Sequence, residues 1–145
     1  MLFEPEIPNN TGNIGRLALA TNSVLHLVGP LGFELTDSKL KRAGLDYWKY
    51  LSLQFYNNIE EFYSTNHNKT LIYLSSHATR SYYEISFEEN MFLVFGKESQ
   101  GLPKEIIERN HNNSFKIPMY SEKIRSLNLA NAVSIVVYEG LRNLE

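Results

Sequence analysis

The sequence contains no cysteine, so disulfide bonds, thiolate metal sites and cysteine nucleophiles are excluded for these 145 residues. Long apolar runs are missing too, because no stretch approaches the roughly 20 residues of a membrane-spanning helix. The first residues, MLFEPEIP, have no basic segment followed by an apolar one, as a secretion signal would. We therefore expect a cytoplasmic protein that does not associate with membranes.

An excess of positive charge is absent as well. Lysine and arginine together number 14 against 16 acidic residues, which gives a net charge of −2. Affinity for nucleic acid of any sequence comes mainly from neutralising phosphates, so any RNA contact of this chain must be local. The four histidines show no metal-ligand spacing, and we expect no metal. The length fits one domain spanning residues 1–145.

Short apolar segments alternate with helical patterns along the chain. Runs rich in β-branched and aromatic residues predict buried strands at residues 24–28, 71–74, 91–95 and 115–117. Three- and four-residue apolar spacing predicts helices at 12–22, 37–43, 59–64, 103–109 and 127–144, the last behind Ser126 as a candidate N-cap. This alternation predicts an α/β fold with a mostly parallel sheet flanked by helices.

A proline-bracketed loop, Pro5 to Arg16, runs into the first predicted helix. Asn10 lies in the predicted first turn, where free backbone N–H groups suit an anionic ligand. A simple capped helix start is the alternative, because Asn and Thr are common caps. Arg16 follows one turn into the helix, and a lone arginine is more often a solvated or salt-bridged surface residue.

Two further segments collect glycine and polar residues where predicted strands end, the usual ligand edge of an open α/β sheet. One contains Gly96 and Gly101, which allow close backbone approach but match neither a dinucleotide nor a Walker motif. The other leads from Ile117 into the last helix, with Ser126 and Asn131 near the helix start. A plain turn and ordinary loop packing are the respective alternatives.

The segment from Lys39 to Trp48 is the densest basic cluster. It places Lys41 and Arg42 beside Tyr47, and basic side chains next to aromatic rings suit RNA contacts. A solvated helix end explains the same pattern, since lysine and arginine are favoured near helix C-termini.

In this order, the strings PEIPNNTGNIGR, KRAGLDYW, LVFGKESQGLP and IPMYSEKIRSLNLANAVSIVVYE cover most of the chain. Together they resemble the SPOUT RNA ribose 2′-O-methyltransferases, and in particular the branch that modifies the tRNA wobble nucleotide. The resemblance implies an α/β fold with a trefoil knot near the C-terminus, an exception to the rule that chains do not thread.

By the same resemblance, S-adenosyl-L-methionine would bind in a bent conformation among three loops. These comprise the strand end at Leu74 and Ser75, the turn with Gly96, Glu98 and Gly101, and the segment with Ile117, Met119, Ser126 and Leu127. Asn10, Arg16, Lys41, Arg42, Tyr47 and Asn131 would contact tRNA. Intact Arg16, Glu98, Ser126 and Asn131 favour an active enzyme over an RNA-binding relative that keeps only the fold.

In related enzymes the arginine of the first motif, here Arg16, is given a role at the ribose 2′-hydroxyl. A guanidinium has no acceptor and stays protonated, so we expect Arg16 to hold a phosphate or stabilise the oxyanion. Asp46, Tyr138 or water would then take the proton.

The resemblance also implies a homodimer and a substrate among leucine tRNAs, with another tRNA or rRNA site as the alternative target. Members of the family usually begin with a fuller first strand, whereas only Met1 to Phe3 precede Glu4 here. We expect a trimmed sheet edge there.

Overall fold

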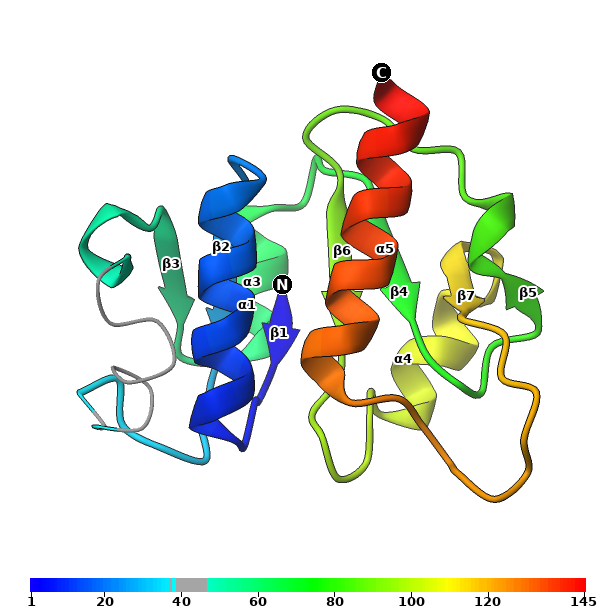
Figure 1. The fold of residues 1–145 in the computed structure, drawn as a ribbon, viewed down its shortest axis with the longest axis horizontal. Helices are drawn as coiled ribbons and strands as arrows, with labels where there is room; N and C mark the ends of the chain where they lie inside the picture. Colours follow the sequence, from blue (N-terminus) through cyan, green and yellow to red (C-terminus); the bar gives the residue numbers. More distant parts are fainter. Residues whose placement is uncertain (37, 39–46) are drawn as a thin grey trace.

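The computed structural model describes residues 1–36, 38 and 47–145 (Figure 1). Its strands are β1 (Leu2–Phe3), β2 (Leu25–Val28), β3 (Leu53–Tyr56), β4 (Leu71–Leu74), β5 (Arg80–Ser81), β6 (Phe92–Phe95) and β7 (Ser114–Lys116). The helices are α1 (Pro8–Ala20), α3 (Ile59–Thr65), α4 (Lys104–Arg109) and α5 (Leu129–Leu144). Short 3₁₀ turns lie at η1 (Trp48–Tyr50), η2 (Tyr82–Glu84) and η3 (His111–Asn113). Apart from Ser38, the predicted helix at 37–43 lies outside the described residues.

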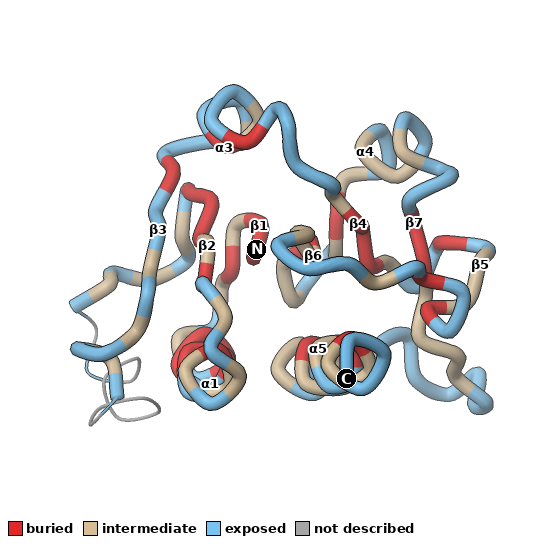
Figure 2. Tube along the Cα trace, turned by 90° about the horizontal axis from the view of Figure 1, so that it is seen from above, coloured by how far each residue is buried: buried red, intermediate tan, exposed pale blue. Residues whose placement is uncertain are grey.

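The strands form one sheet in the order β3-β2-β1-β6-β4-β7-β5, and every pair of neighbours is parallel. Helices α1 and α5 lie side by side on one face of the sheet, and α3 and α4 lie on the other (Figure 2). The predicted α/β architecture with a parallel sheet flanked by helices is confirmed.

Alternate residues of the central strands supply the two halves of the core. In β4, Ile72 and Leu74 pack with the cluster under α1 and α5, whereas Tyr73 packs with the cluster under α3. Residues on successive positions of a strand point to opposite faces, so a strand covered on both sides becomes apolar throughout. This explains why β4 and β6 stood out as continuous apolar runs in the sequence.

The first strand is not at the edge of the sheet, and the expectation of a trimmed edge is wrong. β1 pairs with β2 on one side and β6 on the other, and Leu2 and Phe3 are both buried. The edges are instead β3 and β5, which the sequence did not predict. Edge strands lie half in solvent, and in β3 both Gln54 and Phe55 are exposed, so the apolar signal is weak there.

Two predicted helix starts also need correction. Helix α1 begins at Pro8 rather than residue 12, because proline suits the first helical turn, where its missing N–H is not needed. Helix α5 begins at Leu129, and its N-cap is Asn128 rather than Ser126. The Asn128 side chain accepts a hydrogen bond from the Asn131 backbone N–H at 3.3 Å.

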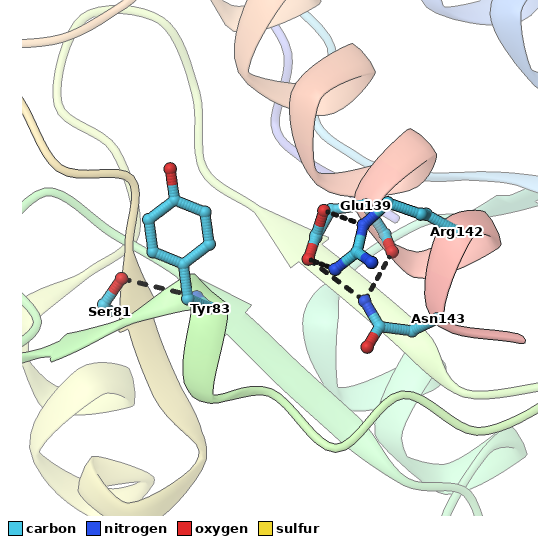
Figure 3. A network of polar contacts seen from close by, with 5 residues as sticks. All are labelled: Ser81, Tyr83, Glu139, Arg142 and Asn143. Atoms are coloured by element: carbon cyan, nitrogen blue, oxygen red, sulfur yellow. Dashed lines mark hydrogen bonds and ion pairs between the residues drawn. The ribbon is translucent and has the colours of Figure 1, made fainter.

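Local polar contacts complete the C-terminal end of α5 and the start of η2 (Figure 3). Glu139 accepts hydrogen bonds from the Arg142 guanidinium at 2.7 and 3.0 Å and from the Asn143 amide, and the Arg142 contact lowers the pKa of Glu139. Ser81 Oγ accepts from the Tyr83 backbone N–H. No helix in the described part of the chain is long and apolar enough to cross a membrane.

Candidate active site

A cleft of about 810 Å³ opens at the carboxyl ends of β4 and β6 and beside the segment that follows β7. Three chain segments line it: residues 74–77 after β4, residues 95–101 after β6, and residues from 117 to the start of α5. Asn10 of α1 closes one side. The segments that the sequence singled out at strand ends therefore do gather at the carboxyl edge of the sheet.

All nine residues predicted to contact a methyl donor line this one cleft. They are Leu74, Ser75, Gly96, Glu98, Gly101, Ile117, Met119, Ser126 and Leu127. The cleft falls in the size range of pockets that bind nucleotide-sized molecules, and it mixes apolar side chains with serine hydroxyls and a glycine turn. Such a lining fits an amphiphilic nucleoside. In the described residues, no group of three or more His, Asp or Glu side chains is arranged to hold a metal ion.

The glycines of the turn after β6 have distinct structural reasons. A Cβ at Gly96 would lie 2.1 Å from the Gly101 carbonyl carbon, so the chain can close on itself only with glycine there. Gly101 has φ +68°, and nothing lies within 4 Å of the position that its Cβ would occupy. The turn is closed by the Gly101 N–H, which donates to the Lys97 carbonyl at 2.8 Å. It is a tight turn that also lines the cleft, so the plain-turn interpretation and the ligand interpretation are compatible.

Glu98 ties this turn to the loop before α1. Its carboxylate accepts hydrogen bonds from the Glu6 N–H at 2.7 Å, the Ile7 N–H at 3.1 Å and the Asn10 amide at 3.3 Å. The sequence suggested that the start of this helix would attract an external anion, but a carboxylate of the chain itself takes that place. The alternative interpretation, a helix start capped by Asn or Thr, is wrong as well, because the N-cap is Ile7 and no side chain accepts a hydrogen bond there.

A second pair of contacts reinforces the connection. The Ser99 hydroxyl and N–H both donate to Glu6 Oε1, at 2.6 and 3.2 Å, and these hydrogen bonds lower the pKa of Glu6. Lys97 Nζ lies 3.1 Å from Glu4 Oε2. We call the contacts of Glu6, Glu98 and Ser99 the latch. The sequence alone did not predict the latch. The only signal for it was that the PEIP loop contains two glutamates and the turn after β6 contains Lys-Glu-Ser, residues that can form complementary hydrogen bonds.

The starts of α1 and α5 meet beside the cleft. Asn128 Nδ2 donates to Asn10 Oδ1 at 3.0 Å, while Asn10 Nδ2 donates to Glu98. Asn10 is buried, with 7% of its surface exposed, so its amide is held from both ends. The Asn10 amide therefore connects two of the three cleft segments, the turn after β6 and the start of α5, to α1.

Of the residues predicted to contact RNA or to take part in catalysis, Asn10 lines the cleft, whereas Arg16, Tyr47, Asn131 and Tyr138 do not. Arg16 is exposed on α1, where its guanidinium carbon lies over the Tyr47 ring, 4.9 Å from the ring centroid. Asn131 and Tyr138 are exposed on α5. Asp46, Lys41 and Arg42 lie outside the described residues. A smaller hollow of about 430 Å³, between α3, β4 and α4, contains none of the predicted site residues.

Comparison with known proteins gives consistent matches over nearly the full length of the chain. The family model described as SpoU rRNA Methylase matches residues 1–138. A protein of Saccharophagus degradans named tRNA (cytidine(34)-2′-O)-methyltransferase is 47% identical, covering 99% of this chain and 94% of its own.

Solved structures agree with that match. One, described as giving insight into 2-OH methylation of C/U34 on tRNA, superposes with a TM-score of 0.94 at 44% identity, over 99% of this chain and 93% of the other. An rRNA methyltransferase of Sinorhizobium meliloti with bound AdoMet superposes with a TM-score of 0.86 at 26% identity, over 99% of this chain and 55% of the other.

Proposed function

The chain belongs to the SpoU rRNA methylase family, and on this premise we propose that it transfers a methyl group from S-adenosylmethionine to the ribose 2′-oxygen of the tRNA wobble nucleotide. One observation carries the proposal: all nine predicted donor-contacting residues line a single cleft. Two relatives described as acting at position 34 of tRNA, at 47% and 44% identity, support the target. Leucine isoacceptors in the cytoplasm are the substrate that we expect. The trefoil knot stays a prediction.

Each part of the cleft has a role toward the donor. The turn from Gly96 to Gly101 would offer backbone groups to the adenine, and the open position at Gly101 leaves room for close approach. Ser75 and Ser126 would offer hydroxyls, and Leu74, Ile117 and Leu127 would pack against apolar parts. When bound, S-adenosylmethionine supplies a methyl group on a sulfonium centre, which a ribose oxygen can displace.

Arg16 acts on the RNA side of the reaction. Its guanidinium offers five N–H donors and no acceptor, so it cannot serve as the base. It therefore holds the phosphate beside the target ribose or stabilises the negative charge that develops on the 2′-oxygen. The proton of the hydroxyl leaves to Asp46, Tyr138 or water, three candidates that mutagenesis can separate.

The position of Arg16 supports a homodimer in which the site is shared between chains. Asn10 lines the cleft, whereas Arg16 lies six residues further along the same helix, about 9 Å along its axis at 1.5 Å per residue. Helices α1 and α5 lie side by side, and exposed Ile135 and Tyr138 on α5 offer a contact surface next to Arg16's helix. A second chain docked there brings its Arg16 toward the cleft of the first. We expect this dimer to be obligate for activity.

The decisive experiment maps 2′-O-methyl nucleotides by mass spectrometry in bulk tRNA incubated with the protein and S-adenosylmethionine. The expected product carries the methyl group on nucleotide 34 of leucine tRNAs, and Arg16→Ala enzyme gives none. Methylation at another position would refute the target. Calorimetric titration of the folded protein with S-adenosylmethionine is the companion measurement, and an absence of binding would refute the enzymatic proposal altogether.

A further inference from the structure

The turn η1 packs directly onto α1 at a glycine. A Cβ at Gly15 would lie 2.7 Å from Trp48 Cζ3 and 3.2 Å from Leu51 Cδ2. The 2.7 Å separation is shorter than real Cβ contacts, so only glycine at this position lets the indole lie against the helix backbone. Trp48 is half-buried there and packs against the core under α1.

This packing determines what surrounds the next residue of the helix. Tyr47, adjacent to Trp48, lies with its ring beneath the Arg16 guanidinium, whose carbon is 4.9 Å from the ring centroid. The carbonyl of Tyr47 also accepts a hydrogen bond from the Tyr50 N–H at 2.9 Å, which closes the turn. Trp48 thus anchors the turn at Gly15, and Tyr47 contacts Arg16 from the same anchored turn.

We propose that Tyr47 and Trp48 are positioning residues for Arg16, and that Gly15 exists to admit the indole that anchors them. The proposal rests on the proposed function, in which Arg16 acts at the ribose. It changes the role expected for Tyr47, which acts through Arg16 rather than by stacking on RNA itself.

The physical advantage lies in the kind of contact that restrains the arginine. An arginine side chain has many rotamers, and ordering it when RNA arrives lowers the gain from binding. A cation–π contact restrains the guanidinium through its face, so the N–H donors at its edge stay available for a phosphate or an oxyanion. A salt bridge would occupy those donors. The ring therefore orients Arg16 before RNA binds and leaves its hydrogen-bonding capacity intact.

The first test compares Tyr47→Leu with Tyr47→Phe. Loss of the ring is expected to lower kcat about two- to fivefold, the range of an exposed cation–π contact, while the KM for S-adenosylmethionine stays unchanged. Phenylalanine keeps the ring face and is expected to restore kcat. Tyr50→Leu is the matched control, because Tyr50 belongs to the same turn but is 67% exposed and contacts Lys49 instead. Wild-type kcat in Tyr47→Leu, or equal losses in both Tyr47 variants, would overturn the proposal.

The second test uses Trp48, the only tryptophan of the chain, as its own reporter. Gly15→Ala must displace the indole from the helix, so the emission maximum of Trp48 is expected to move to longer wavelength as the ring enters water. The same variant is expected to lower kcat without changing donor affinity. An unchanged emission maximum would overturn the anchoring role of Trp48.

A third measurement needs no catalysis. In nuclear magnetic resonance spectra, the Tyr47 ring current is expected to shift the Arg16 Nε–H signal upfield in wild type and in Tyr47→Phe, and not in Tyr47→Leu. An identical Arg16 signal in all three proteins would overturn the pairing. If the signal shifts as expected but no tRNA is methylated, the failure belongs to the proposed function, and the catalytic part of this proposal falls with it.

Discussion

The latch offers the most quantitative prediction, through Glu98→Gln. Glutamine has nearly the same shape as glutamate but only one carbonyl oxygen. Kept at the Oε1 position, that oxygen can still accept from Ile7 and Asn10, but the new NH₂ group then faces the Glu6 N–H, which donates at 2.7 Å in the wild type. One hydrogen bond is replaced by two opposed donors, and the other two become neutral.

The magnitude follows from these contacts. Hydrogen bonds to a charged group contribute about 1.5–3 kcal/mol each, against about 0.5–1.5 kcal/mol for neutral ones. Because Glu98 is only half-buried and two bonds survive, we take the low end and expect a loss of about 2 kcal/mol in the free energy of unfolding. For a domain of this size that lowers the melting temperature by roughly 6 °C.

Two assays check the reasoning. Thermal unfolding by circular dichroism measures the loss of stability, with Glu89→Gln as a control, since Glu89 is exposed at a turn away from the cleft. Titration with S-adenosylmethionine measures the effect on the turn. If only a tenth of the Glu98→Gln molecules keep the turn in its binding conformation, the apparent affinity for S-adenosylmethionine falls about tenfold, because only those molecules can bind it. A Glu98→Gln protein that melts with the control and binds donor like wild type would refute the structural role of the latch.

Four further predictions test other parts of the molecule. Arg16→Ala is expected to lower the rate of methyl transfer about a hundredfold or more, the usual loss for a group that stabilises developing charge. The affinity for the donor, measured by calorimetry, should not change. A loss of both would mean that Arg16 does not have the role proposed for it. Arg16→Ala and Ser126→Trp chains, each inactive alone, are expected to recover about a quarter of wild-type activity when they are coexpressed. Half of the dimers are then mixed, and each mixed dimer has one of its two shared sites intact. No recovery would mean that the site lies within one chain. Gly96→Ala is expected to abolish donor binding, because the new Cβ would collide with backbone atoms of Gly101 and Leu102. Gly101→Ala meets no neighbouring atom, so in denaturant unfolding it is expected to lose only about 1 kcal/mol of the free energy of unfolding, through its left-handed φ. Burial lowers the pKa of His26 from 6.5 to about 4, so the unfolded chain takes up a proton first, and urea midpoints are expected to fall between pH 6.5 and about pH 4; His26→Phe should flatten that part of the profile.

The sequence predicted the elements whose burial is complete. The strand at 71–74 was placed to the residue, because both faces of β4 are covered and its apolar run is continuous. The glycines at 96 and 101 and the polar segment around Ser126 also led correctly to the cleft, since strand ends of a parallel sheet share one edge. The residue types around a strand end are a local feature of the sequence, so a single sequence is enough to recognise them.

Relations between distant residues could not be read in this way. β1 lies inside the sheet between β2 and β6, although the short segment from Met1 to Phe3 suggested an edge strand. The latch joins residues about 90 positions apart, and neither Glu6 nor Ser99 is unusual in its own neighbourhood. The cap of α5 illustrates the same limit: Ser126 and Asn128 are equally good caps by type, and the contact of Asn128 with Asn10 accompanies the choice.

The role of Arg16 is limited both by the family resemblance and by the chemistry of its guanidinium. Resemblance assigned this arginine to the reacting hydroxyl, and acid–base chemistry restricts it to donating hydrogen bonds. The structure adds that Arg16 does not line the cleft beside it in its own chain, and that an aromatic ring restrains it in the meantime. An arginine held away from its own donor cleft suits the proposed dimer, in which it faces the cleft of the partner chain. Dimerisation would then assemble the catalytic site as well as stabilise the fold, and dilution should reduce methyl transfer in step with the dimer while the monomer's own cleft can still be occupied.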